Sequence, residues 1–236
     1  MTTAVRLAGA VGSVQVDPQT PARLWAVVRG DGLYRSDDAG ASFEPVRSFA
    51  AVHVFLNPGA PGVVYLVGDS STHSALFSAD GGASWQEVDM EPAPGLDRWY
   101  KRRMLGELSG IVPDPQHPLG AVAYSRAALW RTSDGVHWVD SSPLYTGYNC
   151  GWYNNGIAFD RDEPDRFALS NADVGMAITD TGGDWFYRRG VPTEWREGAD
   201  PLIPWTSMHA TCFQPGTGVI VSAAGSTWDK QLVRSG

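Results

Sequence analysis

Acidic side chains in the irregular stretches of the chain are the residues with which it could perform hydrolysis. Two carboxyl groups about 6.5 to 9.5 Å apart can cleave a glycosidic bond with inversion, and two groups about 5 to 5.5 Å apart can cleave it with retention. In either case one carboxyl group protonates the leaving oxygen, so a hydrolase needs two acidic side chains that the fold brings together. The candidates outside the regular apolar stretches are Asp69, Asp97, Glu107, Asp173, Glu197, Asp200 and Asp229.

Aromatic side chains are concentrated in the same irregular stretches. The chain has 10 Trp residues, and five of these lie in long connections rather than in the repeated turn motif described below. Flat exposed rings suit the apolar faces of sugars, and clusters of such rings mark binding sites. The alternative is that each ring pins a long loop onto the core. We predict a glycan-binding surface formed by Trp99, Tyr148, Trp152, Tyr153, Trp195, Trp205 and Trp228.

A repeated turn motif organises the elements that must position these residues. Residues 78–85 read S-x-D-x-G-x-S-W, residues 36–43 fit the same template with Phe for Trp, and related versions follow at 132–138 and 178–185. The Asp carboxylate can accept bonds from nearby backbone N–H groups, and Gly supplies a backbone angle that other residues resist. The aromatic residue is expected to pack between neighbouring repeats. We interpret the motif as structural rather than catalytic.

Each repeat reads as four short strands. An apolar stretch ends in Asp-Pro or a similar pair, as at Asp17-Pro18, and a second apolar run follows. A third strand enters the turn motif, as in residues 32–36, and a fourth leaves from its aromatic residue, as in residues 85–88. A four-stranded antiparallel meander repeated radially is the blade of a β-propeller. The sequence therefore predicts an all-β propeller of four-stranded antiparallel blades.

About four and a half blades are visible in one uninterrupted domain, residues 1–236. Their approximate ranges are 8–50, 51–92, 105–142, 154–190 and an incomplete 206–236. We expect a fragment of a larger propeller, for which the missing remainder would be a partner. The alternative is a small ring in which residues 5–7 complete the last blade. Unpaired sheet edges would make an open array prone to association.

Composition excludes several classes of partner. The formal net charge is −8 without a basic run, so nucleic acid is a poor partner. No apolar stretch approaches the ~18 residues of a membrane helix, so we expect no membrane partner. Cys150 and Cys212 lack metal-ligand spacing, and they could pair or stay free. We expect neither a metal nor a cofactor.

The two ends of such blades differ in character. Alternate turns of an antiparallel meander lie at opposite edges, so the Asp-Pro turns and the turn motifs share one edge. The connections between second and third strands, and the long crossings 89–105, 141–155 and 187–206, lie at the other edge. Long irregular loops are where binding and catalytic residues concentrate. We therefore expect any functional site at the edge opposite the turn motifs.

The turn motif is that of the Asp-box, or BNR repeat, and residues 156–185 resemble the opening blade of xyloglucanase-type propeller glycoside hydrolases. That family has two seven-bladed propellers facing across a cleft and inverts configuration with one aspartate from each. Its first-propeller aspartate lies in a motif like T-D-V-G-G-A-Y directly after the second strand. Asp173-Val174-Gly175 matches this motif, whereas Ala172 replaces Thr and Met176 replaces the second Gly.

This resemblance implies a glycoside hydrolase, or a segment of one, that acts on a polysaccharide or oligosaccharide with Asp173 as acid or base. The alternative role for Asp173 is to cap its own loop. The resemblance also implies an extracellular location, although residues 1–7 lack the apolar core of a signal peptide. Sialidases share the repeat, but their arginine cluster and F/Y-R-I-P stretch are not recognisable here.

A non-catalytic scaffold that binds glycan or protein is the alternative function. Sortilin-like receptors and photosystem assembly factors resemble this chain in carrying the same repeat without hydrolysis.

Overall fold

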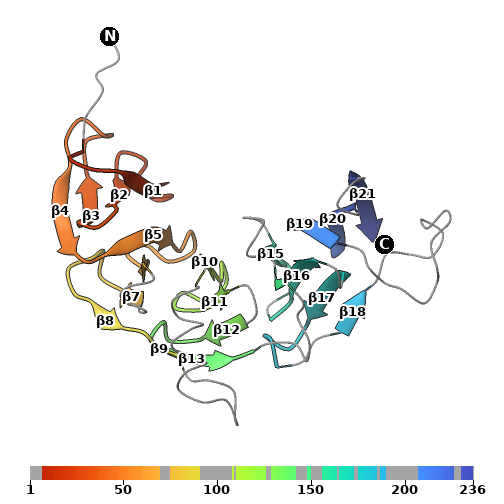
Figure 1. The fold of residues 1–236 in the computed structure, drawn as a ribbon. Helices are drawn as coiled ribbons and strands as arrows, with labels where there is room; N and C mark the ends of the chain where they lie inside the picture. Colours follow the sequence, from red (N-terminus) through yellow and green to blue (C-terminus); the bar gives the residue numbers. More distant parts are fainter. Residues whose placement is uncertain are drawn as a thin grey trace. The chain divides into compact units, whose positions relative to one another are not determined.

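The computed structural model describes residues 7–69, 75–90, 108, 110–125, 129–141, 148–149, 156–163, 165–172, 175–184, 187–189, 207–225 and 230–235. These residues form 21 β-strands in five sheets (Figure 1). The predicted all-β fold with four-stranded antiparallel blades is confirmed. Within the same residues, no helix has the length and apolar character that crossing a membrane requires.

The first two sheets are antiparallel meanders in chain order, β1-β2-β3-β4 and β5-β6-β7-β8. The first consists of β1 (Val11–Val16), β2 (Leu24–Val28), β3 (Gly32–Ser36) and β4 (Glu44–Ser48). The second consists of β5 (Ala51–Leu56), β6 (Val64–Gly68), β7 (Ala75–Ser78) and β8 (Gln86–Glu87).

The third sheet takes an additional strand from the connection that precedes it. Its order is β10-β11-β12-β13-β9, and β9 pairs with β13 in parallel. The predicted crossing 89–105 therefore begins with a strand that extends the next sheet. The strands are β9 (Asp89–Met90), β10 (Gly110–Pro113), β11 (Ala121–Tyr124), β12 (Leu129–Thr132) and β13 (His137–Asp140).

The fourth sheet also has an additional strand. Its path is β14-β16-β17-β18, and β15 pairs with another part of β16. The strands are β14 (Tyr148–Asn149), β15 (Ile157–Phe159), β16 (Phe167–Ala172), β17 (Gly175–Thr179) and β18 (Tyr187–Arg189). The expectation of an irregular crossing over 141–155 is thus wrong at β14.

The fifth sheet shows three antiparallel strands in the described part of the chain, in the order β19-β20-β21. They are β19 (Ser207–Gln214), β20 (Val219–Gly225) and β21 (Lys230–Ser235). The third strand predicted over 231–236 therefore forms.

Residue contacts divide the chain into two compact parts. One comprises residues 1–123 and 132–139, and the other comprises residues 124–131 and 140–236. All three boundaries between these parts fall within strands of the third sheet. The assignment of a single domain with the blade limits given above stays a prediction.

Within each compact part, neighbouring sheets pack face to face through alternate residues of their strands. Trp25 and Val27 of β2 share a buried cluster with Val54 of β5 and Leu66 of β6. In the same way Ala168 and Ile178 of the fourth sheet share a buried cluster with Ile220 of the fifth. We call the face that packs on the following sheet the leading face, and the face that packs on the preceding sheet the trailing face. Period-two alternation in the strands provides each sheet with both faces.

Aromatic side chains fill the contact between the second and third sheets. Tyr65 on the leading face of the second sheet meets Trp138 of the third Asp-box edge to face, with ring centroids 5.9 Å apart. Trp138 is fully buried, and the Tyr65 hydroxyl donates to the Leu119 carbonyl over 3.1 Å. The box aromatic therefore packs between neighbouring repeats, as expected. Trp85 of the second box is only half-buried.

Candidate functional site

The Asp-box turn closes by saturating one aspartate carboxylate with hydrogen bonds. In the second box, the Ser78 hydroxyl and the Ser84 N–H both donate to Oδ1 of Asp80 over 2.8 Å. The Ser84 hydroxyl donates to Oδ2 over 2.5 Å, and the Gly82 N–H donates back to the Ser78 hydroxyl. The first box repeats the same contacts around Asp38. Each turn is thus a closed network of local bonds.

These hydrogen bonds determine the protonation of the box carboxylates. The Ser84 hydroxyl, followed by the Ser84 N–H and the Ser78 hydroxyl, lowers the pKa of Asp80 to about 2. The corresponding bonds from Ser42 and Ser36 lower the pKa of Asp38 to about 2. Both groups are ionised near neutral pH with their acceptor positions occupied. They form turns and are unsuited to donate a proton.

The third box uses a histidine where the first two use a serine. Both the backbone N–H and the Nδ1 of His137 contact the carboxylate of Asp134, at 2.8 and 2.7 Å. Partial burial opposes ionisation of Asp134, but the bonds from His137 outweigh it and hold the pKa of that carboxyl well below its usual range. The Trp138 indole N–H donates to the Gly135 carbonyl over 3.0 Å.

The fourth box differs from the expected alignment. The Thr179 hydroxyl accepts from the Gly183 N–H over 3.0 Å, as the Ser36 hydroxyl accepts from Gly40. Thr181 then occupies the place of the box aspartate, 3.2 Å from Thr179 hydroxyl to hydroxyl. Asp180, which the sequence pattern indicated as the box aspartate, stands one residue earlier and is exposed. The pattern was wrong here because a threonine hydroxyl can replace the carboxylate.

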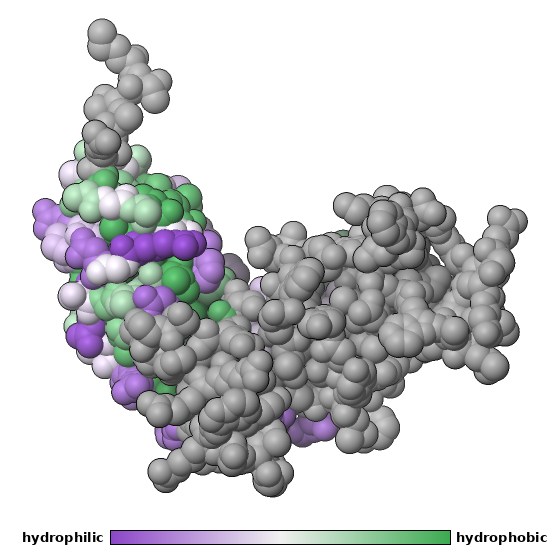
Figure 2. All heavy atoms as spheres, in the orientation of Figure 1, coloured by the Kyte–Doolittle hydropathy of each residue, from purple (hydrophilic) through white to green (hydrophobic). Residues whose placement is uncertain are grey.

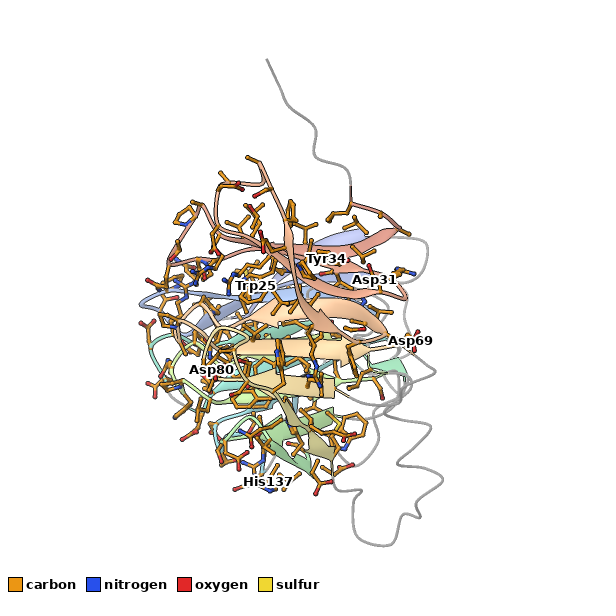
Figure 3. The ribbon with its side chains drawn as sticks, turned by 90° about the vertical axis from the view of Figure 1, so that its left-hand side faces the viewer. Trp25, Asp31, Tyr34, Asp69, Asp80 and His137 are labelled. Carbon is orange, nitrogen blue, oxygen red and sulfur yellow. The ribbon has the colours of Figure 1, made fainter. Side chains whose placement is uncertain are left out.

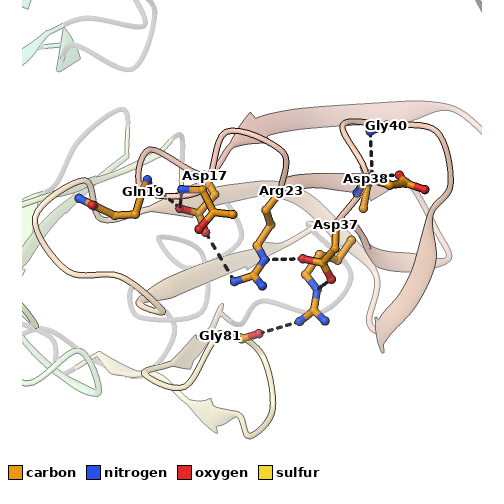
Figure 4. A network of polar contacts seen from close by, with 10 residues as sticks. Asp17, Gln19, Arg23, Asp37, Asp38, Gly40 and Gly81 are labelled. Carbon is orange, nitrogen blue, oxygen red and sulfur yellow. Dashed lines mark hydrogen bonds and ion pairs between the residues drawn. The ribbon is translucent and has the colours of Figure 1, made fainter.

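A second kind of turn lies beside the boxes. Oδ1 of Asp17 accepts from the N–H groups of Gln19 and Thr20 over 2.9 and 3.1 Å. Arg23 then bridges Asp17 and Asp37, which are 3.8 and 2.6 Å from its guanidinium nitrogens (Figure 4). The acidic residues at this edge therefore serve turn geometry and ion pairs.

The opposite edge carries different acidic residues. Figure 3 shows Asp31 and Asp69 toward one side of the sheets and Asp80 toward the other. Asp31 accepts a 2.5 Å hydrogen bond from the Tyr34 hydroxyl, and this bond raises the pKa of Tyr34. The Asp69 N–H donates to the Ala50 carbonyl over 2.7 Å. These residues follow second strands, β2 and β6, as Asp173 follows β16 in the sequence.

Asp173 itself lies outside the described residues, and so does Val174. The strands that flank it are described: β16 ends at Ala172, β17 begins at Gly175, and Asn171 pairs with Gly175. The fourth Asp-box lies at the other end of β17, between β17 and β18. The topology therefore puts the connection that contains Asp173 at the edge opposite that box. The catalytic role of Asp173 stays a prediction.

The predicted aromatic platform is described at one position only. Tyr148 lies in β14, where its backbone pairs with that of Ala172, the residue before Asp173. This strand could not be predicted from the sequence, because two residues carry no periodic signal. The other predicted ring positions lie outside the described residues, as do five candidate carboxylates besides Asp173. The former are Trp99, Trp152, Tyr153, Trp195, Trp205 and Trp228, and the latter are Asp97, Glu107, Glu197, Asp200 and Asp229.

Among the residues that the structure describes, no three His, Cys, Asp or Glu side chains come together as a metal site. Cys212 is an exposed free thiol, and Cys150 lies outside the described residues.

Comparison with known proteins shows a distant similarity to one group of propellers. No protein-family profile matches the sequence. The xyloglucanase Xgh74A of Acetivibrio thermocellus is 23% identical over 203 residues, which is 72% of this chain and 24% of that protein. The chain thus spans about a quarter of the length of this curated relative.

Solved structures show the same fold. An ancestral GH74 enzyme matches 93% of this chain and 29% of its own length, with a TM-score of 0.55 and 14% identity. The GH74 enzyme of Niastella koreensis matches 95% of this chain and 30% of its own length, with a TM-score of 0.54 and 13% identity. YCF48 bound to D1 peptide matches 97% of this chain and 65% of its own length, with a TM-score of 0.55 and 14% identity. The chain thus has the fold of part of a propeller of the GH74 and YCF48 type.

Proposed function

We propose that this chain is a glycoside hydrolase, or a segment of one, that acts on a polysaccharide at the edge opposite the Asp-boxes. The observation that carries the proposal is the pairing of Tyr148 with Ala172. This pairing brings the backbone of one predicted platform residue beside the connection that contains the predicted acid. The similarity in sequence to a xyloglucanase supports a β-glucan backbone as the substrate class.

In this proposal Asp173 acts as the general acid or base. Aromatic rings on the long connections would hold the sugar rings, because flat rings match the apolar faces of sugars. A second carboxyl group must approach Asp173 to the spacing of an inverting or a retaining pair. Asp69 lies at the same edge of its own sheet, as do the connections that contain the remaining candidates.

The test is the release of reducing ends from xyloglucan and a panel of β-glucans by the chain and two variants. Asp173→Asn keeps the shape of the side chain and removes proton transfer, a step worth about 10² to 10⁴-fold in rate. Asp180→Asn is the matched control, because Asp180 is an exposed carboxylate at the box edge. We expect Asp173→Asn to lower the rate by about 10² to 10⁴-fold and Asp180→Asn to keep the wild-type rate.

An active chain whose Asp173→Asn variant keeps its rate within a few-fold would contradict the assignment of Asp173. That residue would then cap its own loop.

A non-catalytic scaffold is the second candidate function. The observation that favours it is the match in fold to YCF48, which is seen bound to a D1 peptide. Binding of several glycans or of an extended peptide without any cleavage would support this candidate. Loss of binding on substitution of Trp152 or Trp195, but not of Asp173, would then identify the surface.

A further inference from the structure

Three hydroxyl side chains are buried together between the fourth and fifth sheets. Ser170 of β16, Ser222 of β20 and Thr211 of β19 are 0%, 3% and 8% exposed. The Thr211 hydroxyl shares one hydrogen bond with the Ser170 hydroxyl and a second, of 2.7 Å, with the Ser222 hydroxyl. We call these three residues the hydroxyl triad. The triad joins three strands that belong to two sheets of one compact part.

The same place in another pair of sheets is entirely apolar. Val27, Val54 and Leu66 share one buried cluster between the first and second sheets. Val54 pairs with Leu66, as the two triad residues of the fifth sheet pair with each other. Val27 and the triad serine of β16 each lie two residues beyond the partner of the residue before the box. Apolar surface, drawn green in Figure 2, also gathers over the region of β1 and β2.

The triad therefore replaces three aliphatic side chains with three hydroxyls. Burial of a hydroxyl costs free energy unless the group forms hydrogen bonds, and aliphatic side chains fill the equivalent place without that cost. Packing of the two sheets alone does not account for the triad.

The triad lies on strands that border connections with predicted site residues. β16 ends at Ala172, directly before Asp173. β19 follows the crossing 187–206, and β20 precedes the connection 226–229. The order of the strands puts all three connections at the edge opposite the Asp-boxes. The acidic and aromatic residues predicted on them thus depend on how these three strands are held together.

Hydrogen bonds hold strands in a more defined geometry than aliphatic contacts do. A hydrogen bond weakens steeply when its length or angle departs from the preferred range. A buried network with satisfied members makes its surroundings rigid. The Ser170 N–H also donates to the Gly156 carbonyl over 2.6 Å, so hydrogen bonds hold both the backbone and the side chain of this residue. A shift of β16 along β19 would break the bond between Ser170 and Thr211.

We propose that the hydroxyl triad fixes the end of β16, and with it Asp173, relative to the fifth-sheet strands that border the other two connections. This inference rests on the function proposed above. The three triad residues are positioning residues, because they act through Asp173 rather than on the substrate. A misplacement of about 1 Å can cost about a hundredfold in rate, so an acid or base needs such a support.

The test replaces the hydroxyls with apolar groups in the variant Ser170→Ala/Thr211→Val/Ser222→Ala. Because the partners are removed together, the midpoint of urea unfolding stays close to that of the wild type. The release of reducing ends from xyloglucan gives kcat and KM. The variant lowers kcat by about ten- to a hundredfold and lowers kcat/KM equally, because the loss affects the transition state. Thr211→Ser keeps a hydroxyl and keeps the wild-type kcat.

Ile220→Val is the matched control for packing. Ile220 is 3% exposed between the same two sheets, and its loss of a methyl group leaves every triad hydroxyl in place. This variant keeps the wild-type kcat. Circular dichroism verifies folding, and Thr211→Val alone replaces the triple variant if the latter does not fold. A wild-type kcat in the folded variant that lacks the hydroxyls, or an equal loss of kcat in Ile220→Val, would overturn the proposal.

Amide hydrogen exchange distinguishes this inference from the proposed function. In the triple variant the amides of Asn171 and Met176 exchange about tenfold faster than in the wild type, and those of β6 keep their rates. A chain that releases no reducing ends contradicts the glycoside hydrolase, whereas the exchange rates still show whether the triad holds the end of β16. Unchanged exchange at Asn171 and Met176 would overturn the positioning role in an active or an inactive chain.

Discussion

At the scale of single residues, the box aspartates make the fold sensitive to acid. The folded pKa of Asp38 and Asp80 is about 2, below the value of about 3.9 for an unfolded aspartate. The folded state therefore binds fewer protons than the unfolded state, and the carboxylates stabilise it above the unfolded pKa. This stabilisation is lost as the pH falls from about 4 through 2.

We expect the free energy of unfolding of Asp80→Asn to fall less steeply between pH 4 and 2 than that of the wild type. The substitution removes a titrating group and keeps one acceptor for the Ser84 N–H. Urea titrations at each pH, followed by circular dichroism, measure the slope. Asp180→Asn is the control and should keep the wild-type slope, because Asp180 lies exposed beside its turn. Parallel slopes for the wild type and Asp80→Asn would contradict the assigned role.

The sequence predicted the boxes well and the candidate site only in part. A box residue acts on neighbours within four positions of the chain, as Ser84 does on Asp80, so the local pattern carries its geometry. The aspartate predicted for the fourth box was wrong, because the hydroxyl of Thr181 occupies the place of the carboxylate. The position of Tyr148 depends on backbone pairing with Ala172, a partner 24 positions away that no local pattern specifies. The role of Asp173 rests on resemblance and stays a prediction.

At the scale of elements, close approach of a box to the preceding sheet demands glycine. Gly135 has φ of +82°, and a Cβ atom there would lie 2.3 Å from the Phe77 ring. Gly30 has a similar φ of +77°, but a Cβ atom there would meet nothing within 4 Å. The two positions share the same backbone strain on substitution and differ in packing alone.

Gly135→Ala should therefore destabilise the chain by more than Gly30→Ala. A left-handed backbone costs an alanine about 1–2 kcal/mol, and overpacking adds about 1–3 kcal/mol at position 135 alone. Urea titration of both variants gives the difference. Equal losses of stability would mean that Phe77 moves aside freely and that the box does not fix the spacing of the sheets.

The order of strands within each sheet followed from the sequence, but the additional strands did not. The four-strand repeat is marked by turns at both ends of each apolar run. β9 and β14 have two residues each and exist because a neighbouring strand presents free backbone groups to them. Such strands form because of tertiary contacts, which the periodicity of the local sequence does not indicate.

At the scale of the whole molecule, neighbouring sheets share buried contacts, as the first does with the second, the second with the third and the fourth with the fifth. The free energy of unfolding of such an array is approximately the sum of the intrinsic stabilities of its repeats and the stabilities of the interfaces between neighbouring repeats. A defect between the second and third sheets should therefore remain local. We expect Gly135→Ala to lower amide hydrogen-exchange protection in β6, β7 and β13 and to leave protection in β19 and β20 unchanged.

Native-state hydrogen exchange followed by mass spectrometry measures this distribution. Ile220→Ala is the reciprocal variant, because Ile220 joins the fourth and fifth sheets. It should lower protection in β17 and β20 and leave β6 unchanged. Uniform loss of protection in either variant would contradict the nearest-neighbour description.

The residue directly before each box serine or threonine bears on how such a chain can grow by gene duplication. Along the five repeats this residue is Arg35, Phe77, Arg131, Ile178 and Arg234, so polar and apolar junctions alternate. Duplication of a single repeat would place two arginines, or two apolar residues, at successive positions of this kind. Duplication of a pair of repeats would preserve the alternation. Recombination that inserts or removes blades should be tolerated best in even numbers.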